Sequence, residues 1–409
     1  MGCTYPTIQW YQNGGLIFTD KASQEKAKTF KDLIQQVHEP GICGQCGGCV
    51  SFCFAGDLTA IEMGPEGKPH YKDEENCLKC GICFLICPQI SILDEEIKEE
   101  YNWKLPIGNY QRITTAISTK KEVLENCSDG GVVTSILLAL LERNLIDGAI
   151  VSQKTGPFGR KPIIATTYEE ILSAAGSRFI GTSQVEELGN YTTYSPAMRE
   201  LGNIRNLDLL RIAVVGTPCQ IHTIRKMQNL GVTPAHVVKY TIGLFCMENF
   251  SFNRSEKEYI EHRLGFKMED IKKINIREDF IVTLKSNDVI YIPLKEIDKL
   301  ARPACFACTD YTNDFADISM GGIGSPEGYT TTIIRTEEGK MMYNEAKRNN
   351  YIQEISKSHK NYSLVSDRLD KLTYFAIKKR ERGLFTLEKL KKGELEHLKQ
   401  MKHDEEIVT

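Results

Sequence analysis

Two short cysteine runs, CGQCGGCVSFC (43–53) and CLKCGICFLIC (77–87), decide the first part of the fold. Each has the spacing Cys-x2-Cys-x2-Cys-x3-Cys, which is a spacing of iron–sulfur ligands. Three thiols two residues apart wrap one side of a cubane, while the fourth leaves the loop and reaches the neighbouring cluster. The runs therefore predict two [4Fe-4S] clusters, one held by Cys43, Cys46, Cys49 and Cys87 and the other by Cys77, Cys80, Cys83 and Cys53.

This double run is typical of a bacterial-type ferredoxin module, which we expect over residues 37–95, after an N-terminal extension at 1–36. A pair of zinc sites is the alternative, because CxxC pairs also bind zinc and eight thiols fill two sites. The repeated x2-x2-x3 spacing favours iron and sulfide. One departure is Phe54, which stands where the ferredoxin pattern has proline after its fourth cysteine.

Composition narrows the class of protein. The chain has 409 residues, and 51 Lys and Arg against 54 Asp and Glu give a net charge of −3, so nothing indicates a nucleic-acid binder overall. The longest uncharged apolar stretch, 130–141, is shorter than the roughly 20 residues that span a bilayer. The N-terminus lacks the pattern of a signal peptide. We expect a cytoplasmic protein that is not an integral membrane protein, in which cysteines serve metal or redox chemistry.

Beyond residue 105 the pattern changes to alternating strands and helices. It predicts an α+β (mixed α/β) domain with a central sheet over 105–336, followed by a charged helical segment, 337–409, at the surface. The charged run DEEIKEE (94–100) is expected to be a solvated linker. Strands are predicted at 113–118, 148–152, 211–216, 239–245 and within 282–294, and helices at 132–143, 168–175, 219–230 and 253–264.

Three glycine-bearing stretches in this domain are candidate ligand loops. Ser128 to Gly131 precede an apolar helix, whose N-terminus favours a phosphate, although a plain helix cap has the same pattern. Gly216-Thr217 likewise follows a predicted strand and begins a predicted helix. Gly321-Gly322 are expected in a flexible ligand loop, although a surface turn has a similar sequence. No complete GxGxxG lies between a strand and a helix, so an ordinary Rossmann NAD site is not supported.

Four further cysteines, Cys219, Cys246, Cys305 and Cys308, are spread over this domain. Each is expected at a strand end or in a loop, where tertiary structure can assemble a cluster. Buried thiols that act as small hydrophobes are the alternative. Cys3 and Cys127 have no assigned role.

Five ordered motifs carry a family resemblance: SDGGVVT (128–134), GTPCQ (216–220), GLFCMENF (243–250), CFACTDY (305–311) and DISMGGIGSPEGYTT (317–331). Over about residues 110–350 the chain resembles the coenzyme F420 hydrogenase/dehydrogenase β-subunit family. That resemblance implies FAD, coenzyme F420 as co-substrate, and a third [4Fe-4S] cluster on Cys219, Cys246, Cys305 and Cys308. The added ferredoxin module is similar to that of the longer members, such as the β-subunits of F420-dependent formate dehydrogenases.

The resemblance also suggests cofactor-binding residues. For FAD they are Ser128, Gly130, Gly131 and Thr134 at the first loop, Gly216, Thr217 and Gln220 at the second, and Gly321 and Gly322 at the third. Because F420 carries a phosphate and a glutamyl tail, its site should be basic. The candidates are Lys154, Arg160, Lys161 and Arg178, with surface solvation as the alternative reading.

The implied activity is hydride exchange between F420 and FAD, with single electrons relayed through the clusters. We expect a catalytic large subunit as partner, most specifically that of a formate dehydrogenase, and a possible downstream electron-accepting complex. The alternatives are an F420H2 dehydrogenase input subunit, an F420-reducing hydrogenase β-subunit, and an electron-relay flavoprotein without F420 turnover.

Overall fold

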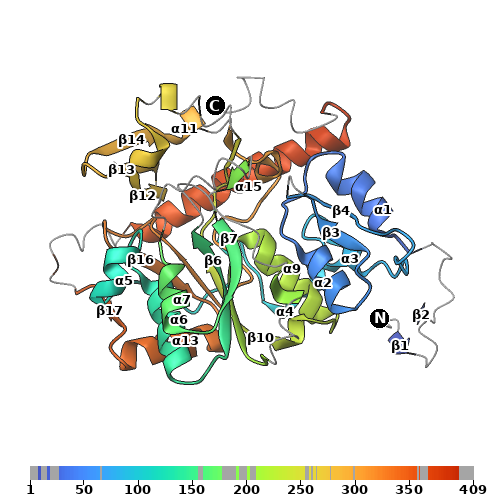
Figure 1. Cartoon of the computed structure of the whole chain (residues 1–409), viewed down its shortest axis with the longest axis horizontal. Helices are drawn as coiled ribbons and strands as arrows, with labels where there is room; N and C mark the ends of the chain where they lie inside the picture. The colour runs from blue at the N-terminus through green and yellow to red at the C-terminus, as the bar shows by residue number, and fades with distance from the viewer. Residues whose placement is uncertain are drawn as a thin grey trace.

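The computed structural model describes residues 27–64, 67–154, 160–176, 209–253, 265–276, 278–297, 300–356 and 367–395, with short pieces at 8–10, 16–18, 190–192, 200–202, 258, 261–263 and 359. Its centre is an eight-stranded mixed sheet with helices on both faces (Figure 1). The strand order is β17-β5-β16-β15-β10-β9-β6-β7. The expected mixed α/β class with a large central sheet is confirmed.

The middle of this sheet is parallel and its edges are antiparallel. Strands β15, β10, β9 and β6 run parallel, whereas β16, β5, β17 and β7 pair antiparallel with their neighbours. The bounds are β5 Arg112–Ser118, β6 Gly148–Lys154, β7 Arg160–Ala165, β9 Ile212–Gly216, β10 Val238–Leu244, β15 Ile318–Gly321, β16 Thr330–Ile334 and β17 Ile352–Glu354. The strands predicted at 113–118, 148–152, 211–216 and 239–245 all lie here.

Helices cover both faces because alternate residues of a strand point to opposite sides. In β9, Ala213 and Val215 join the core under α6, while Ile212 and Val214 join the core under α9. Helices α6 (Val132–Glu142), α7 (Tyr168–Ser173) and α13 (Glu337–Arg348) lie on the first side, with α5 (Lys121–Asn126) beside them. Helix α9 (Pro218–Asn229) lies on the second, with η4 (Ala235–Val237) after it.

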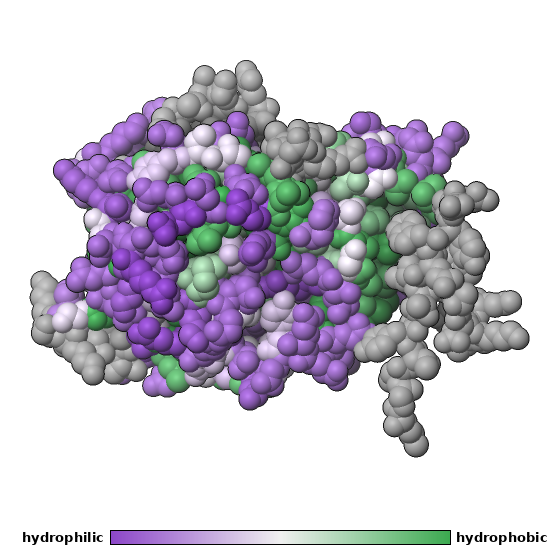
Figure 2. Space-filling view, turned by 90° about the horizontal axis from the view of Figure 1, so that it is seen from below, coloured by the Kyte–Doolittle hydropathy of each residue, from purple (hydrophilic) through white to green (hydrophobic). Residues whose placement is uncertain are grey.

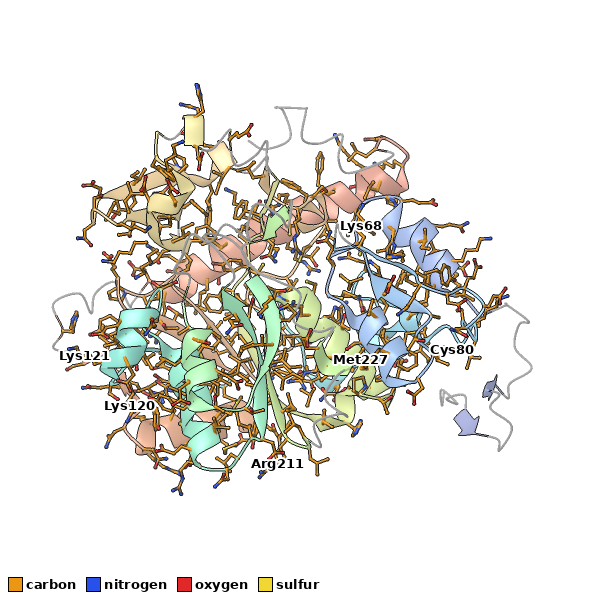
Figure 3. The ribbon with its side chains drawn as sticks, viewed as in Figure 1. Lys68, Cys80, Lys120, Lys121, Arg211 and Met227 are labelled. Carbon is orange, nitrogen blue, oxygen red and sulfur yellow. The ribbon has the colours of Figure 1, made fainter. Side chains whose placement is uncertain are left out.

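The cysteine-rich segment packs outside α9. It contains α1 (Phe30–Leu33), η1 (Ile34–His38), α2 (Gly48–Ala55), the hairpin β3 (Ile61–Met63) and β4 (Pro69–Tyr71), α3 (Ile82–Leu85) and η2 (Ser91–Leu93). Phe30 and Phe84 share one buried core with Phe250 and Phe306 of the larger domain. Figure 3 labels Cys80 in this segment and Met227 on the neighbouring α9. The segment is thus joined to the rest of the chain by apolar packing.

Three local expectations are corrected by the structure. Residues 94–100 form helix α4 (Asp94–Glu100) rather than a solvated linker, because Ile97 is buried and Asp94 pairs with Lys226 at 2.7 Å. The strands within 282–294 belong to a separate antiparallel sheet. That sheet consists of β12 (Ile271–Ile276), β13 (Asp279–Leu284) and β14 (Val289–Pro293).

The C-terminal segment is also not confined to the surface. Strand β17 extends the central sheet past residue 336, and the long helix α15 (Arg368–Lys391) crosses the molecule toward α1 (Figure 1). The remaining elements are β1 (Ile8–Trp10), β2 (Leu16–Phe18), β8 (Asn190–Thr192), β11 (Ser251–Asn253), η5 (Met268–Asp270), α11 (Leu294–Ile297) and α12 (Pro303–Phe306). Most of the helix predicted at 253–264 lies outside the described residues.

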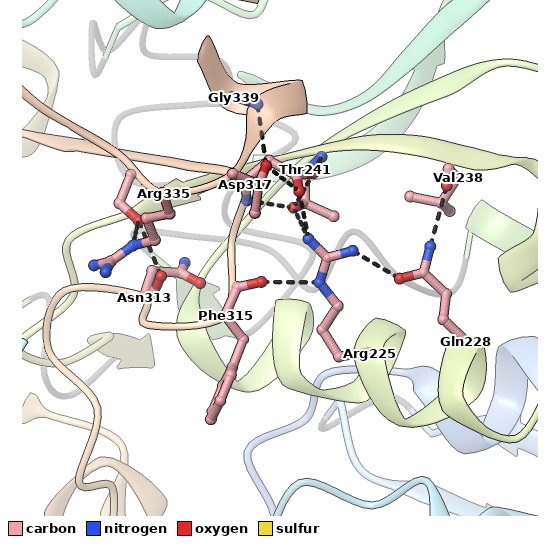
Figure 4. Close-up of polar contacts among 11 residues, drawn as sticks. Arg225, Gln228, Val238, Thr241, Asn313, Phe315, Asp317, Arg335 and Gly339 are labelled. Atoms are coloured by element: carbon pink, nitrogen blue, oxygen red, sulfur yellow. Dashed lines mark hydrogen bonds and ion pairs between the residues drawn. The ribbon is translucent and has the colours of Figure 1, made fainter. Parts of the chain in front are cut away.

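A buried ion pair fixes α9 against the sheet (Figure 4). The Arg225 guanidinium donates to the Asp317 carboxylate at 2.9 Å and to the Thr241 hydroxyl at 2.8 Å. Asp317 also accepts the Thr241 backbone N–H. Because truncating one member would leave the other charge buried and unpaired, this network holds α9 in one position on β10.

In the described part of the chain, no helix has both the length and the apolar character needed to cross a membrane.

Candidate functional site

The two cysteine runs form the same loop twice. Gln45 and Lys79 have φ of 54° and 56°, and Gly47 and Gly81 follow with φ of 83° and 79°. The two glycines are the N-caps of α2 and α3, so the backbone of each cysteine loop turns sharply before the helix begins. Positive φ is inexpensive for glycine alone, which explains a glycine directly after Cys46 and Cys80.

The thiols of these loops form two groups, and the fourth cysteine of each run lies with the other. The pKa of Cys49 is raised by burial and by the charges of Cys46 and Cys43. The pKa of Cys87, from the second run, is raised by burial and by the same two thiols. We call Cys43, Cys46, Cys49 and Cys87 the first thiol group.

The second thiol group has the same construction. Burial and the charges of Cys80 and Cys77 raise the pKa of Cys83, and Cys53 from the first run adds to this effect. Cys83 also raises the pKa of Cys49, so the two groups are neighbours. The structure thus brings together the two sets of four thiols that the spacing predicts.

A third thiol group lies where α9, β10 and α12 meet. Cys219 is in the first turn of α9, Cys246 follows β10, and Cys305 and Cys308 lie in and after α12. Burial raises the pKa of Cys246 to about 12, with further contributions from Cys305 and Cys308. Burial also raises the pKa of Cys219, to which Cys308 and Cys246 both contribute. Four residues spread over 90 positions of sequence therefore meet at one place.

The first and third groups adjoin each other. The charge of Cys46 raises the pKa of Cys219, and a methyl group added at Gly44 would lie 3.6 Å from the Cys219 sulfur. Because Cys83 and Cys49 also interact by charge, the groups follow one another in the order second, first, third. Such a series of sulfur groups is suited to stepwise transfer of single electrons.

A buried cation tests whether the third group fits a cluster. Lys379 of α15 is 1% exposed, and its ammonium donates to the Cys246 carbonyl. Burial alone would lower its pKa, but the charges of Cys308, Cys246 and Cys305 raise it above its ordinary value. A buried ammonium requires negative partners. Thiolates held by a cluster would supply that charge, whereas four neutral thiols would not.

Among the described residues, no three His, Cys, Asp or Glu side chains are arranged around a single metal ion. A cubane instead holds its four thiolates at separate corners, so its ligands do not meet at one point. The donor set and the buried cation fit an anionic cluster.

Two cavities with shared wall residues extend from the start of α6 to the third group. The first, of about 220 Å³, opens at the start of α6, and the second, of about 260 Å³, reaches Cys246. The residues common to both are Ser128, Asp129, Leu244, Met320 and Gly321. A ligand occupying the second cavity would therefore lie against the end of the sulfur series.

Several residues predicted to bind a cofactor line these cavities. Ser128, Gly131 and Thr134 line the first cavity. Ser128, Thr217, Gly321 and Gly322 line the second. The three glycine-bearing loops thus meet at one place, as expected of loops that serve one ligand.

The other predicted residues have structural contacts. The Gln220 side-chain oxygen accepts the Thr217 backbone N–H at 2.8 Å, which closes a capping box at the start of α9. The Gly216 carbonyl accepts from the Asn313 amide. The Gly130 N–H donates to Thr330, where a side chain would strike β5 and β16. These contacts stabilise the conformation of the loops.

None of the basic residues predicted to bind F420 is among the described residues that line the two cavities. Arg178 and the side chains of Lys154 and Arg160 lie outside the described residues, and Lys161 is exposed on β7. Three residues of the site were not predicted: Lys379, Thr223, whose hydroxyl oxygen lies 3.4 Å from the Cys46 sulfur, and Lys226, which donates to the Cys87 carbonyl. A lysine or threonine within a helical pattern does not indicate its tertiary neighbours.

Comparison with known families decides the assignment. Two family models described as "Coenzyme F420 hydrogenase/dehydrogenase, beta subunit" match the chain, the N-terminal one over residues 113–188 and the C-terminal one over residues 209–360. The chain belongs to the coenzyme F420 hydrogenase/dehydrogenase beta-subunit family. Both cavities and the third thiol group draw on these ranges, whereas the cysteine-rich segment precedes them.

Relatives in this family are named for several F420-linked enzymes. The chain is 35% identical to the coenzyme F420 hydrogenase subunit beta of Methanococcus voltae, over 68% of this chain and 94% of that protein. It is 29% identical to a subunit of the F(420)H(2) dehydrogenase of Methanosarcina mazei, over 76% of this chain and 84% of that protein. It is also 31% identical to the coenzyme F420-dependent sulfite reductase of Methanocaldococcus jannaschii, over 79% of this chain and 49% of that protein.

A solved structure has the same fold. One chain of the xenon-derivatized F420-reducing [NiFe] hydrogenase complex from Methanosarcina barkeri superposes with a TM-score of 0.62 at 32% identity, covering 71% of this chain and 96% of that one. Family membership supports F420-linked electron transfer as the class of activity of the chain.

Proposed function

We propose that this chain exchanges hydride between coenzyme F420 and FAD and relays single electrons through three [4Fe-4S] clusters to or from a catalytic partner subunit. The observation that carries the proposal is the series of three thiol groups that ends at the second cavity, where Cys246 is part of the wall. A redox ligand in that cavity would be next to the third cluster.

A bound flavin supplies the conversion between two-electron hydride chemistry and one-electron transfer. The chain's part is to bind and orient the ring systems and to exclude water. Leu244 and Met320 give both cavities apolar walls, while the Gly131 turn and the start of α6 offer backbone N–H groups to a phosphate. We assign this role to Ser128, Gly131, Thr134, Thr217, Gly321 and Gly322, with Gly130, Gly216 and Gln220 supporting their loops.

The cysteine-rich segment is proposed as the relay between this site and the partner. Its second thiol group is farthest from the cavities in the series, and Leu78, beside Cys77, is 65% exposed. In Figure 2, hydrophobic colouring gathers toward the side of the molecule that carries this segment. We propose that a protein partner docks near Leu78, within electron-transfer reach of the second cluster.

The partner is proposed to be the catalytic large subunit of a formate dehydrogenase, as the resemblance to long-form β-subunits implies. A hydrogenase is the second candidate, favoured by the relative from Methanococcus voltae, which the chain covers over 94% of its length. Co-purification and identification of the large subunit distinguishes the two.

Two assays on the isolated, anaerobically purified chain test the proposal. Acid extraction should release FAD, and the protein should oxidise F420H2 with a small dye as electron acceptor. Recovery of FMN alone, or of no flavin, would contradict the FAD assignment. A protein that contains FAD but does not react with F420H2 would instead be an electron-relay flavoprotein.

A further inference from the structure

Lys379 is a buried cation that contacts Cys246, a member of the third thiol group. Its ammonium donates to the Cys246 carbonyl from α15, an element 133 residues away in sequence. One turn later, α15 packs so closely on the loop after α12 that a methyl group at Gly383 would lie 2.7 Å from the Cys308 carbonyl oxygen. The helix therefore holds the ammonium at a defined position next to the backbone of two residues of the third group.

No carboxylate among the described residues forms an ion pair with Lys379. Of the acidic side chains in this region, Glu248 is bonded to Arg382 at 2.8 Å, and Asp310 accepts two backbone N–H groups of its own loop. The ammonium instead donates to the carbonyl oxygen of Cys246, a member of the third thiol group. An unscreened charge at such close range acts strongly, because the buried surroundings have a low dielectric constant.

We propose that Lys379 is a positioning residue that compensates the charge of the third cluster and raises its reduction potential. The inference rests on the proposed function, because it requires that cluster. Each added electron makes a thiolate-bound cluster more negative, so a nearby fixed cation stabilises the reduced state. Since Cys246 also lines the second cavity, the cation would stabilise an electron on the third cluster, next to the flavin site.

Two substitutions separate the charge from the hydrogen bond, and a third is a matched control. Lys379→Met removes both, whereas Lys379→Gln removes the charge and keeps a donor for the Cys246 carbonyl. Lys378→Met removes a lysine from the exposed face of α15 one residue away. Iron content and an EPR-monitored redox titration are measured on each full-length, anaerobically purified protein.

We expect Lys379→Met and Lys379→Gln to shift the potential of one cluster to more negative values, while the other two clusters and Lys378→Met stay unchanged. Loss of about one third of the iron, confined to that cluster, supports the same role in assembly. If Lys379→Gln behaves like the unmodified protein, the side chain acts only through its hydrogen bond and the proposal is overturned.

Three further outcomes count against it. Loss of all clusters in both variants would show that Lys379 supports the fold rather than one cluster. About eight iron atoms in the unmodified protein, instead of about 12, would overturn the proposed third cluster itself. A full iron content with unchanged potentials would overturn the role of Lys379 alone, so the two failures are distinguishable.

Discussion

The hydroxyl oxygen of Thr223 on α9 lies 3.4 Å from the sulfur of Cys46 in the first thiol group. One turn earlier the same helix carries Cys219 of the third group, and one turn later Lys226 donates to the Cys87 carbonyl at 3.1 Å. A single helix therefore holds the first and third groups together. The distance between the two proposed clusters is set by the geometry of α9.

Thr223→Val should lower the reduction potential of one cluster. A metal-bound Cys46 sulfur has no proton, so the hydroxyl is the donor, and valine keeps the shape without it. A hydrogen bond contributes about 1 kcal/mol, equivalent to about 40 mV for one electron. An EPR redox titration measures the shift, and Thr223→Ser should restore most of it. Identical potentials in all three proteins would rule out this bond.

Gly48→Ala should destabilise the contact between α2 and α9. The added methyl carbon would lie 2.2 Å from a methyl group of Thr223, and an overpacked core typically costs about 1–3 kcal/mol. Gly44→Ala is the matched control, because its methyl group meets Cys219 at an ordinary 3.6 Å. Anaerobic urea unfolding compares them. Equal free energies of unfolding for the two variants would show that α2 and α9 can move apart without loss of stability.

The regular elements were predictable because their signals are local. The apolar run at 132–143 became α6, and β-branched runs became strands of the central sheet. The cysteine grouping was also predictable, since a fixed spacing of thiols belongs to one known chemistry. By contrast, the pattern did not separate the strands within 282–294 from the central sheet, because strand pairing depends on partners distant in sequence.

Proton binding by His38 should make the free energy of unfolding depend on pH. Burial and the charge of Lys68 lower its pKa to about 4. The unfolded chain binds a proton at this position below about pH 6.5 and the folded chain does not, so stability is full above pH 6.5 and falls as the pH drops toward 4. The expected loss between pH 7.5 and 5.5 is about 1 kcal/mol.

His38→Phe should remove this part of the pH dependence while retaining the ring contact with Phe30. Urea unfolding at the two pH values measures it, and the exposed His236 provides a control through His236→Phe. An unchanged slope in His38→Phe would mean that another group accounts for the loss.

The parts of the site that escaped prediction depend on tertiary contacts. Lys379 belongs to a charged helix whose composition indicates a solvated surface, yet it is buried against the third thiol group. Gln220 was expected to bind a cofactor, but its side chain caps α9, because the GTPCQ motif also satisfies a capping box. Sequence shows which residue types are present, and packing decides which of them face one another.

The order of the electron path is tested most directly by Cys219→Ala. The unmodified protein and the variant are each mixed anaerobically with F420H2, and flavin absorbance and cluster EPR signals are followed. In the unmodified protein we predict bleaching of the flavin followed by reduction of all three clusters. In Cys219→Ala, the flavin should still bleach, while the first and second clusters remain oxidised for lack of the third. Reduction of those two clusters at the unmodified rate would contradict the account.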